Sequence, residues 1–314
     1  FPYQLTLGAI QDNKLIYEMG RQVALDFKRI GMHVNFAPVA DINNNPKNPV
    51  IGFRSFGDNK FKVAEKVTAY MKGLQDNQVI VSVKHFPGHG DTEVDSHQDL
   101  PQLPFTKARL DSMELYPFKE LIKEGASGIM VAHMNIPVLD NTPNLPSTLS
   151  KPIVTTLLKE ELGFKGLIFS DAMEMKGVAK FYPNGAGDVI GIIAGLDVIE
   201  LSGNSKRAVK LVRQAINKKR LSWQQVNTSV KKILFGKYWS GLNNSRYVQP
   251  QNIVADLNRV EAKELNQKLA DAAVTLLNSD IQLKNFDRRK KTAIVSLGSN
   301  ELTMLQMALR PALP

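Results

Sequence analysis

Short apolar segments alternate with helix-like segments through the first two-thirds of this 314-residue chain, and this alternation constrains the fold most. Strand-like segments cover residues 32–40, 79–84, 128–132, 167–170 and 197–201. Helical patterns cover residues 59–76, 107–124, 150–161, 206–217 and 222–239. Alternation of this kind predicts a parallel sheet, either open or closed into a barrel.

Ionisable residues follow these strands at the point where each strand ends. Asp41, the pair Lys84 and His85, His133 and Asp171 all come directly after, or close, an apolar strand. In a parallel barrel every strand delivers its carboxyl end to one mouth, where the chemistry takes place. An open doubly wound sheet would gather such residues only near a switch point, and no Gly-rich phosphate loop follows any of these strands. The pattern therefore favours an α/β fold of the TIM-type (β/α) barrel class.

One loop concentrates the titratable groups. Residues 84–97 read KHFPGHGDTEVDSH, contain three of the five histidines, and follow the buried-strand pattern at 79–83. Titratable groups gathered on a loop at a strand end are typical of a catalytic site. Residue types alone leave two other interpretations open, a solvated surface turn or a metal site that uses His85, His89, Asp91, Asp95 and His97.

The same loop resembles the signature loop of glycoside hydrolase family 3, in its β-N-acetylglucosaminidase branch. The similarity extends over roughly residues 30–240 in the right order and includes the segment FSDAMEMKG at 169–177. The resemblance implies a (β/α) barrel whose first strand precedes residue 1, so we expect the chain to lack that strand.

The resemblance also implies the catalytic groups of a retaining glycosidase. Asp171 takes the position of the nucleophile, His97 that of the general acid/base, and Asp95 that of the carboxylate that orients the histidine. Without the resemblance, Asp171 is interpreted equally well as a helix N-cap, and His97 as a loop histidine without a role. A proline and two glycines before this pair predict that residues 88–98 form a mobile loop.

A second set of residues is predicted to contact the sugar. In the family, the Lys-His pair that closes the strand binds sugar hydroxyls, and so do an aspartate in a segment like FAPVAD and an arginine in one like RSFG. His133 is also predicted from its strand-end position, although a buried structural histidine fits nearly as well, and a core Met is the default alternative for Met175. The predicted sugar contacts are Asp41, Arg54, Lys84, His85, His133 and Met175.

The composition excludes several other classes of protein. A hydrophobic content of 43% is ordinary for a globular domain, and no apolar run is long enough to span a membrane. The absence of cysteine excludes disulfides and Cys-ligated metals. The net charge is +10, but the basic residues are scattered, with small clusters at 218–220 and 288–291 and no basic stripe interleaved with aromatics, which argues against nucleic acid as a partner. We expect a carbohydrate substrate, no cofactor and no metal.

Residues 241–314 change in character. Residues 241–245 (GLNNS) are typical of a linker, a helix is predicted at about 262–275, and residues 292–297 (TAIVSL) have a buried-strand pattern. This resembles the opening of the α/β sandwich domain in two-domain family members. We therefore predict a catalytic barrel over 1–240, a linker over 241–261 and the incomplete beginning of a second α/β domain over 262–314, with the chain cut at both ends.

The expected reaction is removal of terminal, non-reducing β-linked N-acetylglucosamine from peptidoglycan fragments or related glycans, through a glycosyl ester on Asp171. A β-glucosidase or an N-acetylglucosamine phosphorylase of the same family stays open as an alternative. A metal-dependent hydrolase and an inactive sugar-binding fragment are alternatives of other classes. The sequence does not determine the aglycone, the compartment (cytoplasmic, periplasmic or secreted) or the oligomeric state.

Overall fold

A computed structural model describes residues 1–244, 247–276, 301–309 and 311. The chain divides into two compact units, Phe1–Val274 and Thr275–Pro314. Within the described part of the second unit, one helix is present, α12 (Met304–Leu309). The strand predicted at 292–297 and the basic cluster at 288–291 lie outside the described residues.

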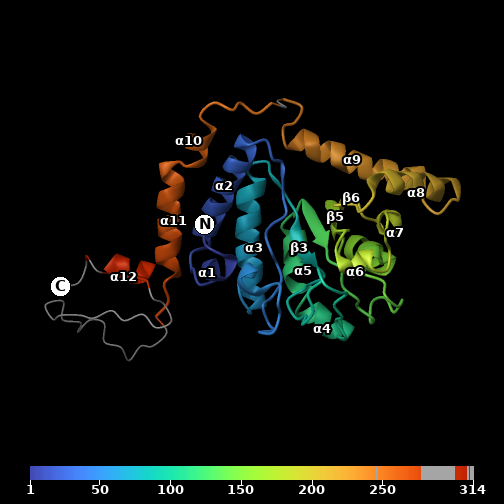
Figure 1. Cartoon of the computed structure of the whole chain (residues 1–314), viewed down its shortest axis with the longest axis horizontal. Helices are drawn as coiled ribbons and strands as arrows, with labels where there is room; N and C mark the ends of the chain where they lie inside the picture. Colours follow the sequence, from blue (N-terminus) through green and yellow to red (C-terminus); the bar gives the residue numbers. More distant parts are fainter. Residues whose placement is uncertain (245–246, 277–300, 310, 312–314) are drawn as a thin grey trace. The chain divides into compact units, whose positions relative to one another are not determined.

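Parallel strands form the centre of the first unit (Figure 1). Their bounds are β1 (Val34–Asn35), β2 (Ile80–Val81), β3 (Val83–Phe86), β4 (Gly128–Val131), β5 (Leu167–Ala172) and β6 (Val198–Glu200). Strand β1 pairs with β2, and β3, β4, β5 and β6 follow one another in sequence order, with every pair parallel. Because only Ser82 separates β2 from β3, and a parallel bridge joins Val39 to Lys84, the two sheets continue one another. The strands therefore form five extended segments in sequence order, as a (β/α) barrel requires.

Each of the five predicted strands is confirmed in position and in parallel order. Among the described residues no strand pairs β6 with β1, so the described part of the sheet is not closed. Strands β1 and β2 are short, with two residues each, whereas the register shifts lie between β3 and β4 and between β5 and β6.

Side chains alternate between the two faces of the sheet, as the strand period of two demands. Val81, Ile129 and Ile168 belong to the large core that the helices cover, whereas Met130 and Phe169 belong to a second cluster on the opposite face. Both clusters are buried, which is why the strand sequences read as nearly continuous apolar runs instead of alternating ones.

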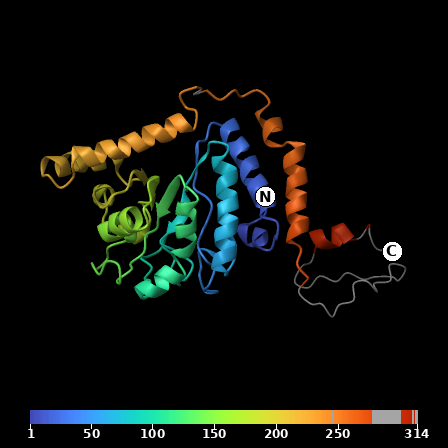
Figure 2. The same cartoon turned by 180° about the vertical axis from the view of Figure 1, so that it is seen from behind.

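Helices pack around this sheet, and Figure 2 shows α2 and α3 side by side from behind. The helices up to α5 are α1 (Gln4–Gly8), α2 (Asn13–Arg29), α3 (Lys60–Gln75), α4 (Lys107–Ser112) and α5 (Tyr116–Lys123), with a short 3₁₀ turn η1 (Gly52–Arg54). The later ones are η2 (Ser147–Leu149), η3 (Pro152–Glu161), α6 (Lys176–Ala179), α7 (Ala186–Ala194), α8 (Ser205–Asn217), α9 (Trp223–Trp239), α10 (Ile253–Leu257) and α11 (Val260–Ala273).

The predicted helices are confirmed within a few residues, and their ends follow local chemistry. Asn59 caps α3 by accepting hydrogen bonds from two backbone N–H groups, and Ser222 caps α9 by accepting one from Gln225. The helical pattern predicted over 107–124 forms two helices, α4 and α5, and Pro117 lies in the first turn of α5, where a missing backbone N–H costs no hydrogen bond. Helix α2 was not among the predicted helices, although Asp12 caps it in the same way.

The compact unit extends further along the chain than the predicted barrel boundary at residue 240. Arg29 of α2 pairs with Asp256 of α10 at 2.7 Å, and Arg259 pairs with Asp26 at 3.0 Å. Leu269 of α11 is fully buried in the main core. The helix expected to open a second domain thus belongs to the first unit, because its apolar face is buried against α1 and α2. That the chain beyond it begins an α/β sandwich stays a prediction.

No helix in the described ranges is both long and apolar enough to cross a membrane.

Candidate active site

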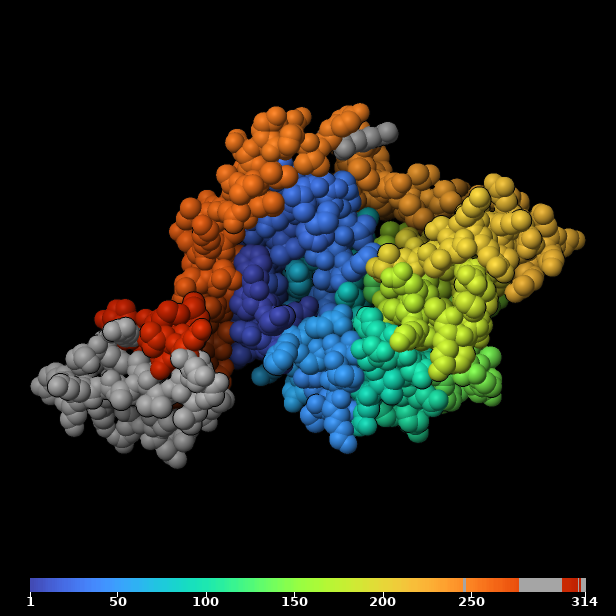
Figure 3. Space-filling view, in the orientation of Figure 1, coloured from blue at the N-terminus to red at the C-terminus, as the bar shows by residue number. Residues whose placement is uncertain are grey.

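The carboxyl ends of the strands bring together most of the residues predicted to act on a sugar. Lys84 and His85 lie in β3, Asp171 near the end of β5, and His133 just beyond β4. On the face shown in Figure 3, segments near residues 50, 100 and 180 lie next to one another, although they are far apart in the sequence. The strand-end positions of these residues in the sequence predict this convergence.

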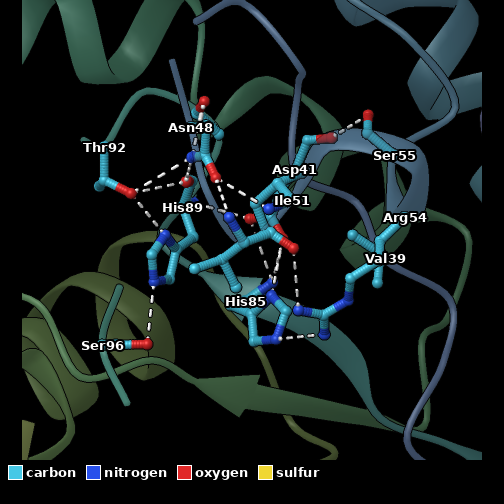
Figure 4. A network of polar contacts seen from close by, with 12 residues as sticks. Val39, Asp41, Asn48, Ile51, Arg54, Ser55, His85, His89, Thr92 and Ser96 are labelled. Carbon is cyan, nitrogen blue, oxygen red and sulfur yellow. Dashed lines mark hydrogen bonds and ion pairs between the residues drawn. The ribbon is translucent and has the colours of Figure 1, made fainter. Parts of the chain in front are cut away.

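Asp41 is fully buried at the centre of a hydrogen-bond network (Figure 4). Its Oδ1 accepts the backbone N–H of His89 at 2.7 Å, its Oδ2 accepts the ring Nδ1–H of His85 at 2.7 Å, and the backbone N–H of His85 lies 3.2 Å from both oxygens. Burial acts to raise the pKa of Asp41, but the rings and N–H groups of the two histidines more than offset it, so its pKa lies below the ordinary value.

His85 is oriented from both sides of its ring. Arg54 places Nη2 3.3 Å from Nε2 of His85, and a guanidinium can only donate, so Nε2 accepts and the proton is assigned to Nδ1, which faces Asp41. Arg54 and His85 are thereby in direct contact, and their predicted contacts with a sugar stay predictions. Asp41 already accepts hydrogen bonds from three N–H groups of the protein, and its predicted direct contact with sugar hydroxyls stays a prediction.

Lys84 lies among carboxylates at the mouth of the sheet. Burial, followed by the charge of Arg54, lowers the pKa of Lys84, whereas the charges of Asp171, Glu200 and Asp41 act to raise it. The balance keeps the pKa below its ordinary value, but the three acidic neighbours stabilise the ammonium form. A cation in this position can donate to sugar hydroxyls while it holds the nearby carboxylates in their charged state.

Asp171 is partly buried, and its Oδ1 accepts the backbone N–H of Ala172 at 2.9 Å. Burial acts to raise the pKa of Asp171, but His85, His133, that N–H and Lys84 together lower it below the usual range. A carboxylate held ionised in a water-poor mouth is what a glycosidase nucleophile requires. The alternative interpretation of Asp171 as a helix N-cap is wrong, since β5 continues to Ala172 and Met175 occupies the N-cap of α6.

The predicted Asp-His pair is formed. Nδ1 of His97 lies 2.6 Å from Oδ1 of Asp95, and the same oxygen accepts the backbone N–H of His97 at 2.8 Å. The side chain of His97 is 58% exposed, so its other nitrogen is accessible from solvent. Burial acts to raise the pKa of Asp95, but the N–H and ring of His97 more than offset it and the pKa lies below its ordinary value. Asp95 is thus a stable anionic partner for a charged imidazole.

His133 and Met175 are less accessible than expected for direct ligands. His133 is fully buried, with Nδ1 2.6 Å from Oγ1 of Thr148 and Nε2 3.0 Å from the carbonyl oxygen of Ala172. The second contact supports the backbone directly after Asp171. Met175 is 7% exposed, and its N–H donates to the carbonyl of Ala172. The geometry favours supporting roles for both, and their predicted contacts with sugar stay predictions.

Two contributors to the site, Glu200 and Asn48, were not predicted from the sequence. Glu200 ends β6, so a second carboxyl group lies at the same mouth as Asp171. Burial, followed by the charge of Asp171, raises the pKa of Glu200. A charged residue at the end of a short strand was the available signal. Asn48 donates from Nδ2 to the carbonyl oxygens of His89 and Gly90 at 2.8 and 3.1 Å, and nothing local in the sequence marked it.

No group of three or more His, Asp or Glu side chains within the described ranges is arranged to hold a metal ion. The buried histidines are engaged instead: His85 with Asp41 and Arg54, and His89 with Thr92 and Ser96. The exposed His97 is engaged with Asp95. The loop that suggested a metal site is therefore built as a hydrogen-bond network.

Cavities flank the sheet at different places. Arg54 and Lys84 line a cavity of about 360 Å³ that is otherwise walled mainly by the N-terminal segment and by apolar side chains such as Tyr70. Another, of about 400 Å³, lies at the amino ends of β4 and β5 beside Phe235 and Trp239 of α9. None of the predicted site residues lines the second cavity, so the chemistry and this cavity are at opposite ends of the strands.

The chain belongs to glycosyl hydrolase family 3, because residues 1–235 match the family's N-terminal domain. This assignment, with the sequential parallel strands, agrees with the TIM-type barrel class predicted from the sequence.

Among curated relatives, β-hexosaminidase A of Pseudoalteromonas piscicida is 31% identical over 323 residues, which cover 96% of this chain and 53% of the relative. A β-hexosaminidase of Nitrosomonas eutropha is 36% identical over 186 residues, which cover 57% of this chain and 52% of the relative. The solved structure of a family 3 β-N-acetylglucosaminidase from Paenibacillus sp. FPU-7 superimposes with a TM-score of 0.82 at 38% identity, covering 88% of this chain and 53% of that one. The chain spans about half the length of these relatives.

Proposed function

We propose that this protein is a retaining glycosidase that removes terminal, non-reducing β-linked N-acetylglucosamine. The observation that carries the proposal is the strand-end carboxylate of Asp171, held ionised by its surroundings, in a family 3 chain that also forms the His97–Asp95 pair. The relatives reported above, which are named β-hexosaminidases and a β-N-acetylglucosaminidase, support this choice of sugar.

In the first step, protonated His97 donates its proton to the glycosidic oxygen while Asp171 attacks the anomeric carbon. The carbon–oxygen bond to the aglycone breaks, the aglycone leaves as an alcohol, and a glycosyl ester forms on Asp171. The carboxylate of Asp95 stabilises the charged imidazole before transfer and fixes its orientation throughout.

In the second step, neutral His97 accepts a proton from water as that water attacks the anomeric carbon of the ester. The ester bond breaks, N-acetylglucosamine is released with retained configuration, and Asp171 returns to its carboxylate form. Lys84, Arg54 and His85 are the proposed sugar contacts: Lys84 and Arg54 can donate to sugar hydroxyls, and the His85 ring, which Asp41 and Arg54 hold in one orientation, shapes the subsite.

The substrate class follows from the same proposal. Fragments of peptidoglycan and related glycans end in β-linked N-acetylglucosamine, and such ends fit an enzyme that cuts one sugar at a time from a strand-end mouth. The sugar preference is tested by comparing nitrophenyl β-N-acetylglucosaminide with its β-glucoside analogue. A higher kcat/KM for the first substrate is expected, and a preference for the glucoside would overturn the choice of sugar.

Hydrolysis and phosphorolysis are separated by the product. A histidine acid/base adds less negative charge beside the anomeric centre than a carboxylate, so phosphate can in principle replace water as the acceptor. We expect free N-acetylglucosamine as the product in phosphate buffer, and sugar 1-phosphate would instead identify a phosphorylase. Activity that EDTA abolishes and added metal restores would favour a metal-dependent hydrolase.

A further inference from the structure

The signature loop has two parts with different surroundings. The inner loop, residues 84–92, is buried: His89 and Thr92 are each 1% exposed. The outer loop, residues 93–98, carries the exposed His97, its partly buried partner Asp95, and Val94, which is 42% exposed. Ser96 is the exception, because it lies between the two members of the pair and is 2% exposed.

Ser96 connects the outer loop to two other parts of the site. Its hydroxyl lies 3.1 Å from Nε2 of His89 (Figure 4), and its carbonyl oxygen accepts the backbone N–H of Gly177 at 3.3 Å. Gly177 belongs to α6, which follows the strand that carries Asp171. One residue thus contacts both the inner loop and the segment that follows the proposed nucleophile.

His89 is itself held on all sides. Its N–H donates to Asp41 at 2.7 Å, its carbonyl oxygen accepts from Asn48 at 2.8 Å, and its Nδ1 lies 2.8 Å from Oγ1 of Thr92. Thr92 also receives a hydrogen bond from Asn48 and can donate to the carbonyl of His89 at 3.2 Å. All these bonds are made together when Nδ1 carries the proton, and Nε2 then accepts from the Ser96 hydroxyl.

We propose that His89 and Ser96 are positioning residues whose mutual hydrogen bond sets where the Asp95–His97 pair stands relative to Asp171. The inference rests on the proposed function, in which His97 transfers the proton. It extends that function by assigning roles to two residues that touch neither the sugar nor the reacting atoms.

The surroundings of the pair explain why such positioning is needed. The side chains of Asp95 and His97 hydrogen-bond to each other and, in the described part of the chain, to no other side chain. Their mutual bond fixes the ring relative to the loop but not the loop relative to the substrate. Close backbone packing also holds Ser96 in place. The backbones approach so closely that a Cβ added to Gly177 would lie 3.1 Å from the Ser96 carbonyl oxygen.

The test replaces Ser96 by Ala, which removes the hydroxyl and leaves the backbone contact with Gly177. For a natural disaccharide, whose leaving group needs a proton, we expect kcat to fall about tenfold with KM changed less than about twofold. For the dinitrophenyl glycoside, which leaves unprotonated, we expect kcat within about twofold of the parent value. Ser96→Thr keeps the hydroxyl and should recover most of the lost kcat.

The matched control is Ser240→Ala, which removes another buried serine hydroxyl (3% exposed), whose partner is the carbonyl of Gly236 in α9. This control should leave both substrates unchanged. An equal loss on both substrates in Ser96→Ala, or no loss on either, overturns the proposal.

A second readout is independent of the proposed reaction. Without substrate, hydrogen exchange of the amides at 94–98 should be faster in Ser96→Ala than in the parent and the Ser240→Ala control. Unchanged exchange overturns the positioning role. If the parent chain releases no sugar from the dinitrophenyl β-N-acetylglucosaminide, the proposed function fails, and the exchange result still decides the positioning role.

Discussion

The inner loop and the outer loop are neighbours in one continuous segment, yet they place the same residue type in opposite environments. His89 is buried, and burial together with the charge of His85 lowers its pKa to about 4, so it is neutral at physiological pH. His97, eight positions later, has a 58% exposed side chain and bonds to an anionic partner. One histidine-rich motif therefore contains both a buried structural histidine, His89, and an exposed histidine proposed to transfer a proton, His97. The difference in burial distinguishes the two roles.

A physical reason supports this division. A sugar subsite gains from side chains held in one orientation before substrate arrives, which needs a buried and fully bonded network. A general acid must exchange its proton with solvent between turnovers and must admit the substrate, which needs exposure. The expectation that residues 88–98 form one mobile loop is therefore wrong for 88–92, where the hydrogen bonds of His89 and Thr92 hold the backbone.

The largest expected loss of kcat comes from a substitution outside both loops, at Asp171. The effects of substitutions in the two loops are compared with this loss. Asp171→Ala should lower kcat at least about ten-thousandfold on every substrate, because each one needs the covalent step. A 2-fluoro sugar with a good leaving group should label Asp171 in the parent, as read by peptide mass spectrometry. Labelling at Glu200 would move the nucleophile to β6.

The outer loop is tested by His97→Ala. We expect kcat on a natural disaccharide to fall by about 10² to 10⁴, with a much smaller loss on the dinitrophenyl glycoside, since only the poor leaving group needs the proton. Because the side chain is exposed, the thermal midpoint should stay within about 1 °C of the parent. Asp95→Ala should behave similarly but more mildly. The same factor on all substrates would make His97 a binding residue.

The inner loop is tested by Asp41→Asn. The amide would present a donor where the N–H groups of His85 and His89 and the ring of His85 need an acceptor, so the free energy of unfolding should fall by about 3–5 kcal/mol. Urea unfolding at pH 7 measures this. If Asp41→Asn kept the free energy of unfolding but lost activity, the main role of Asp41 would be to bind the sugar and not to stabilise the inner loop.

The buried histidine also predicts a pH dependence. The folded-state pKa of His89 is about 4 and the unfolded value is near 6.5, so the unfolded chain binds the extra proton between these values. Stability should therefore rise with pH from about 4 to 6.5, and this one residue contributes roughly 3 kcal/mol of that rise. Urea midpoints at pH 4.5 and 7 in the parent and in His89→Gln isolate the contribution. Equal pH slopes in both would show that the folded protein does not lower the pKa of His89.

The smallest expected effect comes from a substitution at an exposed position of the outer loop, and it tests whether this loop is less tightly packed than the inner loop. Val94→Thr, at a 42% exposed position, should change the free energy of unfolding by less than about 0.5 kcal/mol and leave kcat nearly unchanged. A larger loss of stability would show that the outer loop packs against the rest of the unit as the inner loop does.

The sequence by itself determined the order and type of the elements. Apolar runs ending in Asp41, Lys84 or Asp171 predicted parallel strands that share one mouth, and the strands at 128–131 and 167–172 occur where the pattern placed them. It also determined the family, because the signature loop and the segment around Asp171 are long and specific. Element type and the family motifs depend on residues that are close together in the sequence, so hydrophobic periodicity and short motifs are enough to predict them.

Only the tertiary structure decided which polar residues are buried and with whom they bond. His89 is neutral because burial, followed by the charge of His85, lowers its pKa, and the residues that help to bury it include Asp41 and Asn48, more than forty positions earlier. Burial, followed by the charge of Asp171 on the adjacent strand, raises the pKa of Glu200, and α11 joins the first unit through Leu269. The burial and the charge state of a side chain depend on contacts between segments that are distant in the sequence. Neither hydrophobic periodicity nor composition predicts those contacts.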